Sequence, residues 1–234
     1  MSTRKKFFLV FSFIIFDAAL VIGILAIRDA TSINKLKGEV NTLASMNILT
    51  DDYNTPIKTS GKYAIVEKSI KEYLNGYAVG VQDIFEIVTD EQLKNILSYS
   101  NYQADGPNFD KSLEYLASSK DDFNKRIDVL IDTTNEDNIE KYVNQNIKDD
   151  YYKALYIRLM TSDEMTASLY PTKDLLMRTK IRQNNIYDVS IEVLNYLKVY
   201  KDSWSLENNE IKFKNEDLYN HYIELISKLD NKEE

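Results

Sequence analysis

Residues 7–27 read FFLVFSFIIFDAALVIGILAI, and only Ser12, Asp17 and Gly23 interrupt an otherwise apolar run. A helix rises about 1.5 Å per residue, so this segment is roughly 30 Å long, which is the thickness of the hydrocarbon core of a bilayer. We therefore expect a transmembrane helix over 7–27, with the rest of the chain attached to it.

This segment is longer than the roughly 7–15 apolar residues of a secretory signal peptide. Its candidate cleavage sites are also poor. Cutting after Ala26 would place Ile24 at position −3, and cutting after Ala30 would place Arg28 there. The chain has no cysteine, which excludes a lipid-modified N-terminal cysteine. We interpret 7–27 as an uncleaved signal anchor.

The orientation of the anchor is judged from the basic residues on its two sides. Residues 1–6 carry three contiguous basic residues next to the apolar run, whereas the three that follow the span are scattered. We expect 1–6 to be a cytoplasmic tail and the bulk of the chain to be extracytoplasmic. Many Tyr, Asn, Lys and Ile residues indicate an AT-rich bacterial genome, so the membrane is expected to be a bacterial plasma membrane.

Asp17 lies at the centre of the expected span. A carboxylate there costs about 2.5–3.5 kcal/mol on insertion scales, so an intramembrane acid is first interpreted as a contact with a membrane partner. Ala19 and Gly23 form a small-xxx-small pair that suits close helix packing. The alternatives are a protonated Asp17 tolerated in lipid and a hydrogen bond within a homodimer.

The remainder of the chain has the length and composition of one acidic helical domain. Residues 29–234 contain 25 Lys and Arg against 36 Asp and Glu, a net charge of −11. This balance argues against nucleic acid as a partner. The absence of cysteine excludes disulfides and thiol chemistry. Six Gly and three Pro in 234 residues favour helices.

Apolar spacing of three and four residues divides the expected helices. Residues 28–49 are predicted to be a helical stalk, and residues 50–229 are predicted to be the extracytoplasmic helical domain. Residues 230–234 are expected to form a frayed tail. Within the domain we predict helices over 62–88, after Thr89 from a Thr89–Gln92 capping box, over 109–132, 136–160 and 172–202, and after Asn215. Gly76 and Gly80 are expected to mark a bend or a close helix crossing.

Residues 204–213 alternate on either side of Asn208–Asn209, and asparagine tolerates positive φ, so we predict a small β-hairpin. The fold class is therefore all-α: a single transmembrane helix followed by a bundle of five or six helices with one hairpin near the C-terminus.

The hairpin and the last helix also carry a resemblance to other proteins. The resemblance is based on the spacing of seven residues: Ser205, Asn209, Ile211, Phe213, Tyr222, Leu225 and Ile226. These roughly 30 residues resemble a family of uncharacterised helical bacterial envelope lipoproteins. This chain departs from that pattern because a membrane span replaces the lipidated cysteine. The resemblance implies a fold and a location, and it implies no activity.

No residue pattern of an enzyme or a cofactor site was found in the sequence. The single histidine, His221, shares a helix face with Asp217 and Glu224, but one histidine and two carboxylates make a thin zinc site. A solvated polar face is the simpler interpretation. The pairs Asp51–Asp52, Asp121–Asp122 and Asp149–Asp150 were considered as a calcium site or as the carboxylates of a glycosidase. They lie in loops or on helix exteriors and lack the spacing of a calcium loop, so surface charge is the simpler interpretation. We therefore expect no catalytic residues, no metal and no cofactor.

Two further groups of residues were considered as binding sites. Lys173, Arg178, Lys180 and Arg182 form the one basic patch of an acidic domain, which can dock an acidic partner or lipid headgroups, or simply offset neighbouring acids. Tyr151, Tyr152 and Tyr156 lie at helical spacing, which is more typical of a core than of a ligand groove.

Taken together, the sequence predicts a membrane-anchored, non-catalytic protein that mediates protein interactions at the bacterial cell envelope. The first alternative is an accessory subunit of a multi-span transporter or secretion complex, joined through the transmembrane helix. An envelope enzyme is the second alternative. The expected partners are the bilayer through 7–27 and a membrane or envelope protein; a homodimer is also compatible with the sequence.

Overall fold

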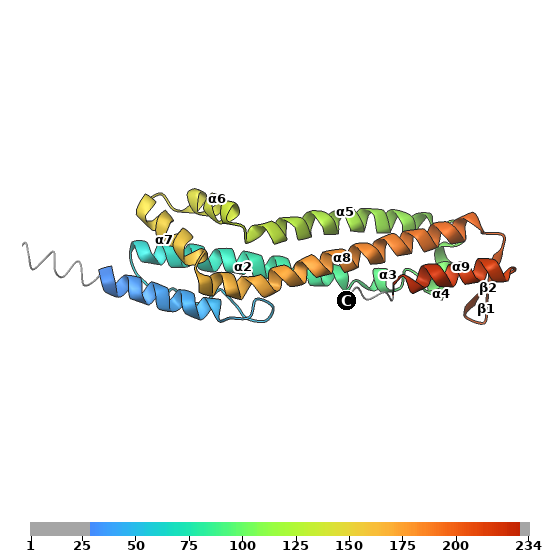
Figure 1. Cartoon of the computed structure of the whole chain (residues 1–234), viewed down its shortest axis with the longest axis horizontal. Helices are drawn as coiled ribbons and strands as arrows, with labels where there is room; N and C mark the ends of the chain where they lie inside the picture. Colours follow the sequence, from blue (N-terminus) through green and yellow to red (C-terminus); the bar gives the residue numbers. More distant parts are fainter. Residues whose placement is uncertain (1–28, 230–234) are drawn as a thin grey trace, which may run out of the picture. The chain divides into compact units, whose positions relative to one another are not determined.

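The computed structural model describes residues 29–229 (Figure 1). It is mostly helical, with 74% helix, as predicted. A first helix covers residues 29–44. The elements that follow are α2 (Lys62–Val88), α3 (Glu91–Lys94), α4 (Tyr99–Asp105), α5 (Asp110–Thr133), α6 (Glu136–Asn146), α7 (Asp150–Met160), α8 (Asp163–Val199), β1 (Trp204–Glu207), β2 (Glu210–Phe213) and α9 (Glu216–Ser227).

The described residues form two compact units. The first takes residues 29–75 and 136–169, and the second takes 76–135 and 170–229. The helices α2 and α8 each contribute their first part to the first unit and their remainder to the second. The two units are described separately below.

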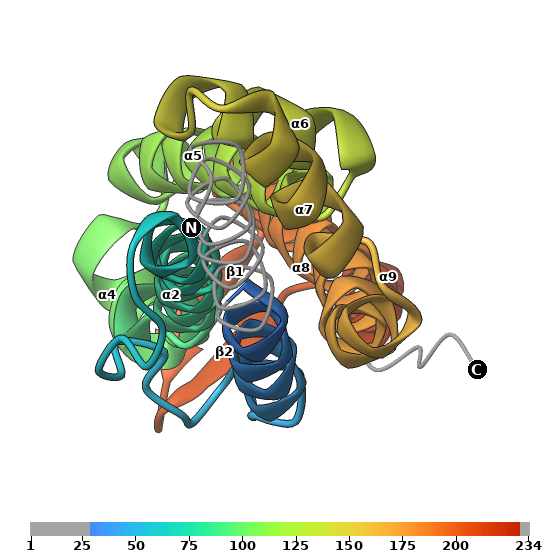
Figure 2. The same cartoon turned by 90° about the vertical axis from the view of Figure 1, so that its left-hand side faces the viewer.

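In the first unit, helix 29–44 lies beside the first part of α2 (Figures 1 and 2). Its apolar residues Leu36, Val40 and Leu43 follow the predicted three- and four-residue spacing, and all three are buried. The face predicted for a stalk is therefore part of the core of this unit. Apolar burial of this kind stabilises a fold by about 25 cal/mol for each Å² removed from water.

The prediction of one helix over 136–160 is wrong, because the chain breaks between α6 and α7. Asp149 stands immediately before α7, and its side chain accepts a hydrogen bond from the backbone N–H of Tyr151 at 3.1 Å. An N-cap of this kind satisfies one of the free N–H groups at a helix start. The Asp149–Asp150 pair, interpreted from the sequence as surface charge, thus marks a helix boundary.

In the second unit, α5 and the later part of α8 run side by side (Figure 1). Asn124 and Asn184 exchange hydrogen bonds between their side-chain amides at 2.8 Å, which joins the two helices. Phe123 and Tyr187 are buried together between them, with ring centroids 6.1 Å apart. The ion pairs Asp121–Lys125 and Asp122–Arg126, each between residues four positions apart, form on the exposed side of α5.

Gly80 marks a close crossing of α2 and α5, which is one of the two alternatives predicted for Gly76 and Gly80. A Cβ atom at Gly80 would lie 2.7 Å from Cδ1 of Leu130. A Cβ atom at Gly76 would meet nothing within 4 Å. The GxxxG spacing therefore contains one packing glycine and one glycine without a steric role.

The predicted hairpin is confirmed. Strands β1 and β2 pair antiparallel, with Trp204 opposite Phe213 and Glu207 opposite Glu210. Asn208 and Asn209 form the turn with φ of 51° and 62°, in the left-handed region where asparagine is tolerated. Phe213 packs on Tyr222 of α9, with ring centroids 5.4 Å apart. Asn215 caps α9, as predicted, by accepting from the N–H of Asp217 at 2.7 Å.

Three other boundaries differ from the predictions. The cap of α3 is Asp90, which accepts from the N–H of Leu93, whereas Thr89 donates back to Phe85. Residues 99–105 form the separate helix α4, for which no helix was predicted. Helix α8 starts before Pro171, because Ser162 accepts from the N–H of Met165, and Pro171 lies inside the helix.

The predicted membrane span 7–27 and the predicted tail 230–234 lie outside the described residues. Within 29–229, no helix combines the length and the apolar character needed to cross a bilayer.

Candidate functional site

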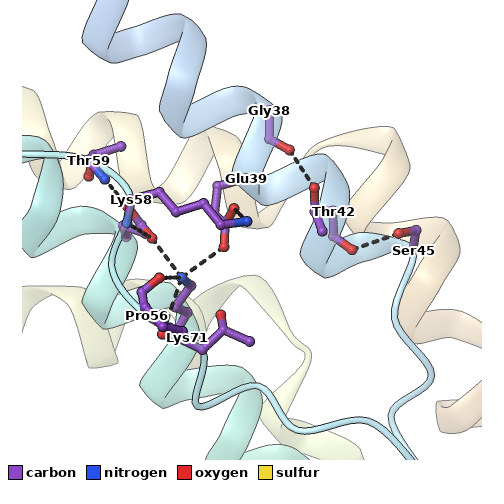
Figure 3. Close-up of polar contacts among 10 residues, drawn as sticks. Gly38, Glu39, Thr42, Ser45, Pro56, Lys58, Thr59 and Lys71 are labelled. Carbon is purple, nitrogen blue, oxygen red and sulfur yellow. Dashed lines mark hydrogen bonds and ion pairs between the residues drawn. The ribbon is translucent and has the colours of Figure 1, made fainter.

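The first unit contains a buried cluster of charges. Glu39, Glu67 and Lys71 expose 3%, 0% and 4% of their side chains. They come from helix 29–44 and from α2, and the loop between these helices completes the cluster with Lys58, whose side chain remains partly exposed. Figure 3 shows the Lys71 ammonium between Glu39 and the loop.

Lys71 uses its ammonium group to hold three segments together. Its Nζ lies 2.6 Å from Oε1 of Glu67, 2.8 Å from Oε1 of Glu39 and 2.8 Å from the backbone oxygen of Pro56 (Figure 3). An ammonium group has three N–H donors, so these short contacts use all of them. Glu39 is also paired with Lys58, at 2.6 Å.

The Glu67 side chain fastens the loop to α2 by accepting hydrogen bonds from the loop backbone. Its Oε1 accepts from the N–H of Lys58 and its Oε2 accepts from the N–H of Thr59, both at 2.8 Å. These bonds satisfy two loop amides that would otherwise lack partners inside the protein. The cluster thus contains two carboxylates and two ammonium groups, and its net charge is zero.

The pKa directions agree with this geometry. Burial raises the pKa of Glu67, but hydrogen bonds from Lys71, Lys58 and Thr59 outweigh it and hold the pKa below its usual value. Burial acts on the Glu39 pKa in the same direction and is outweighed by hydrogen bonds from Lys58 and Lys71. Burial lowers the pKa of Lys71, and the two carboxylates more than reverse this.

Glu39, Glu67 and Lys71 therefore stay charged and paired at neutral pH. A general acid or base needs a pKa near the working pH, and these groups are shifted away from it. The chemistry of the cluster is that of a clamp, which positions the loop over α2.

Sequence reasoning did not single out this cluster. Glu67 and Lys71 were interpreted as polar residues of an amphipathic helix, and Glu39 as part of a polar stalk. A signal was present, because Glu39 lies three residues after Leu36 and four before Leu43, on the apolar face. A charge in the middle of an apolar stripe is the pattern to look for.

A hollow of about 360 Å³ adjoins the cluster, between the loop and α2. Ligand pockets in proteins typically measure about 300–1,000 Å³, so the hollow has the size of a small-molecule site. It is lined by Asn54, Thr55, Pro56, Ile57, Lys68, Lys71, Glu72 and Asn75.

The predicted basic patch lies in the second unit, on α8. Three of its four residues contact a neighbouring side chain: Lys173 donates to Asn135 at 2.7 Å, Arg178 pairs with Asp174, and Lys180 pairs with Asp128. Arg182 is exposed. The patch is thus partly offset by two aspartates, and it retains an excess of positive charge.

An exposed apolar row runs along the same stretch of α8. Tyr170, Met177 and Ile181 expose 66%, 46% and 59% of their surface. Positions seven and four residues apart lie on one face of a helix, so these side chains share a face, and Met177 and Ile181 are neighbours on it. We call this row, together with Arg178 and Arg182 on its flank, the α8 face. Sequence reasoning found the charges of this face and missed its apolar part.

The tyrosines of α7 differ in burial. Tyr156 is fully buried, whereas Tyr151 is half exposed. The Tyr152 ring packs on Tyr63 at 5.2 Å, and the Tyr156 ring packs on Tyr142 at 6.1 Å. Tyr156 thus belongs to the core, and Tyr151 lies at its exposed edge.

His221 lies on the exposed side of α9, where its Nδ1 is 3.2 Å from Oε2 of Glu224. Its ring also packs edge-on against Tyr196. Among residues 29–229, no group of three or more His, Cys, Asp or Glu side chains is arranged to hold a metal ion. The predicted membrane contacts Asp17, Ala19 and Gly23 lie outside this part of the chain.

Comparisons with known proteins found no matching family model, no matching curated protein and no matching solved structure. The resemblance of the hairpin and α9 to envelope lipoproteins stays a prediction. Function is therefore inferred from the geometry of this chain.

Proposed function

We propose that this chain is a membrane-anchored, non-catalytic protein that binds a protein partner at the outer face of a bacterial plasma membrane, and that the α8 face is the docking surface. The observation that supports this proposal is the row of Tyr170, Met177 and Ile181, exposed at helical spacing beside two arginines. The apolar segment 7–27 supplies the anchor.

The chemistry of the α8 face indicates the kind of partner. Scattered exposed apolar residues are ordinary, but a contiguous row with a polar rim is typical of an interaction surface. Aromatic residues, Met and Arg are enriched at protein interfaces. A helix or groove that carries an apolar strip flanked by carboxylates complements this face.

Charge favours the same partner. The chain carries a net charge of −8, so an acidic partner is repelled by most of its surface. The arginines of the α8 face form a local positive region that attracts an acidic partner instead. Charge complementarity of this kind selects the partner and its orientation more than it adds affinity.

The experiment is crosslinking in native membranes followed by purification of the full chain. Met177→Glu combined with Ile181→Glu should lower the recovery of the partner about tenfold, because two carboxylates would enter an apolar contact opposite acidic groups. Val129→Glu on α5, a more exposed apolar position in the same unit, is the control. Full recovery of the partner with the double variant would contradict the docking role.

A second candidate function rests on Asp17. If this residue pairs with a polar group of a multi-span protein, the chain is an accessory subunit joined within the membrane. Asp17→Leu would then leave the partner group unpaired in lipid, at a cost of about 0.6–2 kcal/mol. Loss of a multi-span protein with Asp17→Leu, and its retention with Leu20→Ala, would favour this candidate. Retention of every partner with Asp17→Leu would exclude it.

A further inference from the structure

One end of the first unit gathers aromatic side chains around Asp29, at the start of helix 29–44. The hydroxyl of Tyr63, near the start of α2, donates to Oδ1 of Asp29 at 2.5 Å. The Tyr63 ring packs edge-on against Tyr152 of α7, with ring centroids 5.2 Å apart, and Tyr152 packs edge-on against Tyr151 at 5.1 Å. The Lys62 ammonium lies 5.5 Å from the centre of the Tyr152 ring. We call Asp29, Lys62, Tyr63, Tyr151 and Tyr152 the basal cluster.

The basal cluster has a buried side and an exposed side. Tyr63 is buried and Tyr152 is half-buried. Tyr151 exposes 52% of its surface, and Lys62 exposes 64% of its side chain. Burial and hydrogen bonds with Asp29 and Tyr151 raise the pKa of Tyr63, so its hydroxyl keeps its proton at neutral pH. The exposed Tyr151 ring is therefore held by buried neighbours.

The basal cluster lies close to the end of the expected anchor. Helix 29–44 and α2 begin at the same end of the first unit (Figure 1). The apolar segment 7–27 ends at Ile27, and Asp29 follows two residues later. Two residues span at most about 7 Å in any backbone conformation, and the headgroup region on each side of the hydrocarbon core is about 5–8 Å thick. If 7–27 spans the bilayer, Asp29 and the Tyr63 hydroxyl bonded to it lie in or beside the headgroup region.

From this placement we infer that the basal cluster is a membrane-contact surface, at which the Tyr151 ring enters the headgroup region of the bilayer that holds the anchor. The inference rests on the proposed membrane anchor, and it does not depend on the α8 face. Tyrosine is enriched at membrane–water interfaces, because its ring is apolar and its hydroxyl bonds to water and headgroups.

The charges beside the ring favour the interface itself over one kind of headgroup. Lys62 pairs with Asp149 at 2.8 Å, and Lys153 pairs with Asp150 at 3.2 Å. Attraction to an anionic leaflet needs an excess of basic residues near the surface, and each of these pairs is neutral. The aromatic ring is therefore the group that contacts lipid, and the contact should form in neutral and in anionic bilayers alike.

This contact gives the basal cluster a mechanical role. A domain attached to a single span can tilt about the short connection between Ile27 and Asp29. A ring seated in the headgroup region adds a second point of attachment on α7, so it limits the tilt of the first unit. The basal cluster thus holds the first unit in one orientation on the membrane.

The experiment is spin-label EPR on the full chain in phosphatidylcholine nanodiscs. The chain has no cysteine, so one engineered cysteine carries one label. Ala154→Cys places the label on the exposed face of α7 one turn after Tyr151, and Leu49→Cys places it beyond the other end of helix 29–44. The measurement is the ratio of collisions with oxygen, which dissolves in lipid, to collisions with a water-soluble nickel chelate.

We expect this collision ratio to be severalfold higher for the Ala154→Cys label than for the Leu49→Cys label. Added phosphatidylglycerol should leave the ratio unchanged. Equal ratios at the two positions, in chains recovered with the nanodiscs, would overturn the inference. A raised ratio that appears only in anionic nanodiscs would overturn it as well, because charge and not the ring would then make the contact.

Substitutions of Tyr151 test whether its ring makes the contact. In the Ala154→Cys chain, Tyr151→Glu should lower the collision ratio severalfold, to the level of Leu49→Cys, because a carboxylate loses hydration among lipids. Tyr151→Phe keeps the ring and should retain the ratio. Tyr219→Glu, at an exposed tyrosine of the second unit, is the matched control. An unchanged ratio with Tyr151→Glu, or an equal loss with Tyr219→Glu, would contradict the contact.

Failure of this inference is distinguishable from failure of the proposed function. A full chain that does not co-purify with nanodiscs has no anchor, and that result would overturn both. With the anchor in place, equal collision ratios would overturn the basal contact alone. Met177→Glu with Ile181→Glu should lower partner recovery and leave the ratio at Ala154→Cys unchanged, whereas Tyr151→Glu should do the reverse.

Discussion

Lys71 is the side chain that joins the two buried carboxylates of the first unit to the loop between its helices. It is almost fully buried, and its three donors reach three different segments of the chain. A buried ion pair is weak evidence for stability in itself, because desolvation offsets the attraction. Removing one partner is different, since the remaining charges stay buried without compensation.

Lys71→Met is therefore expected to lower the free energy of unfolding by about 3–5 kcal/mol, because Glu39 and Glu67 would lose their shared partner. The measurement is urea unfolding followed by far-UV circular dichroism. Lys68→Met, three residues earlier and 65% exposed, is the control and should change stability by less than about 0.5 kcal/mol. Equal effects of the two substitutions would show that the cluster is not a clamp.

Glu67 allows a test by pH. Its pKa in the folded protein lies below the ordinary value of 4.5, so its ionised form stabilises the fold above pH 4.5. That contribution is lost as the pH falls through the folded pKa, below 4.5. In Glu67→Gln the contribution is absent at every pH. The difference in unfolding free energy between wild type and variant should therefore be constant from pH 5 to 7 and shrink as the pH falls below about 4.5.

The control for this pH series is Glu91→Gln, because Glu91 is highly exposed. It should show no comparable change between pH 5 and pH 3. A difference for Glu67→Gln that stays constant down to pH 3 would contradict the assigned role of the ionised carboxylate.

At the scale of elements, the two glycines of α2 separate helix propensity from packing. Both lie inside the helix, where glycine is less favourable than alanine by about 0.5–1 kcal/mol. Only Gly80 faces another helix closely, since Leu130 of α5 occupies the space of its missing Cβ. The same substitution at the two positions therefore isolates the cost of the close crossing.

Gly76→Ala is expected to raise the free energy of unfolding by about 0.5–1 kcal/mol. Gly80→Ala is expected to be less stable than Gly76→Ala by about 1 kcal/mol or more, because Leu130 must move to admit the methyl group. Both values are obtained from urea unfolding under one set of conditions. A gain in stability for Gly80→Ala equal to that for Gly76→Ala would show that α2 and α5 do not cross closely there.

The hairpin shows how an element is positioned by its neighbours. Its turn follows from two asparagines, but its place is decided by Phe213, whose ring contacts Tyr222 and Tyr219 of α9. A two-stranded hairpin is marginal in water on its own, so its packing on α9 stabilises it. The same contact orders the start of α9, which follows three residues later.

At the scale of the whole molecule, the proposal requires the described domain to lie outside the plasma membrane. Protease added to cells without a wall should remove the domain and leave a fragment of about 30 residues, because a span of roughly 20 residues is protected by lipid. The fragment is detected by mass spectrometry of the membrane fraction. Full protection of the chain in cells with an intact membrane would overturn this orientation.

Several features of the fold were predictable because they depend on a few neighbouring residues. The limits of α2, the hairpin and the cap at Asn215 follow from local backbone preference and from apolar spacing. The break between α6 and α7 was missed because the apolar spacing continues across it. The decisive signal there was Asp149, whose side chain caps α7.

The candidate sites were less predictable than the helices. The charges of the α8 face were found from the sequence, since four basic residues within ten positions stand out in an acidic chain. Its apolar row was missed because the sequence does not distinguish an exposed apolar residue from a buried one. On α8, the exposed Met177 lies directly after the buried Leu176, and only packing distinguishes them.

The sequence by itself determined that this chain is mostly helical, where its hairpin turns, and that 7–27 is an apolar run, because these properties depend on neighbouring residues. Only the tertiary structure decided that Glu39, Glu67 and Lys71 are buried partners and that a hollow lies beside them. The reason is physical: a charged residue on a helix has the same local pattern whether water or an opposite charge faces it. Its environment is set by segments that lie tens of residues away along the chain.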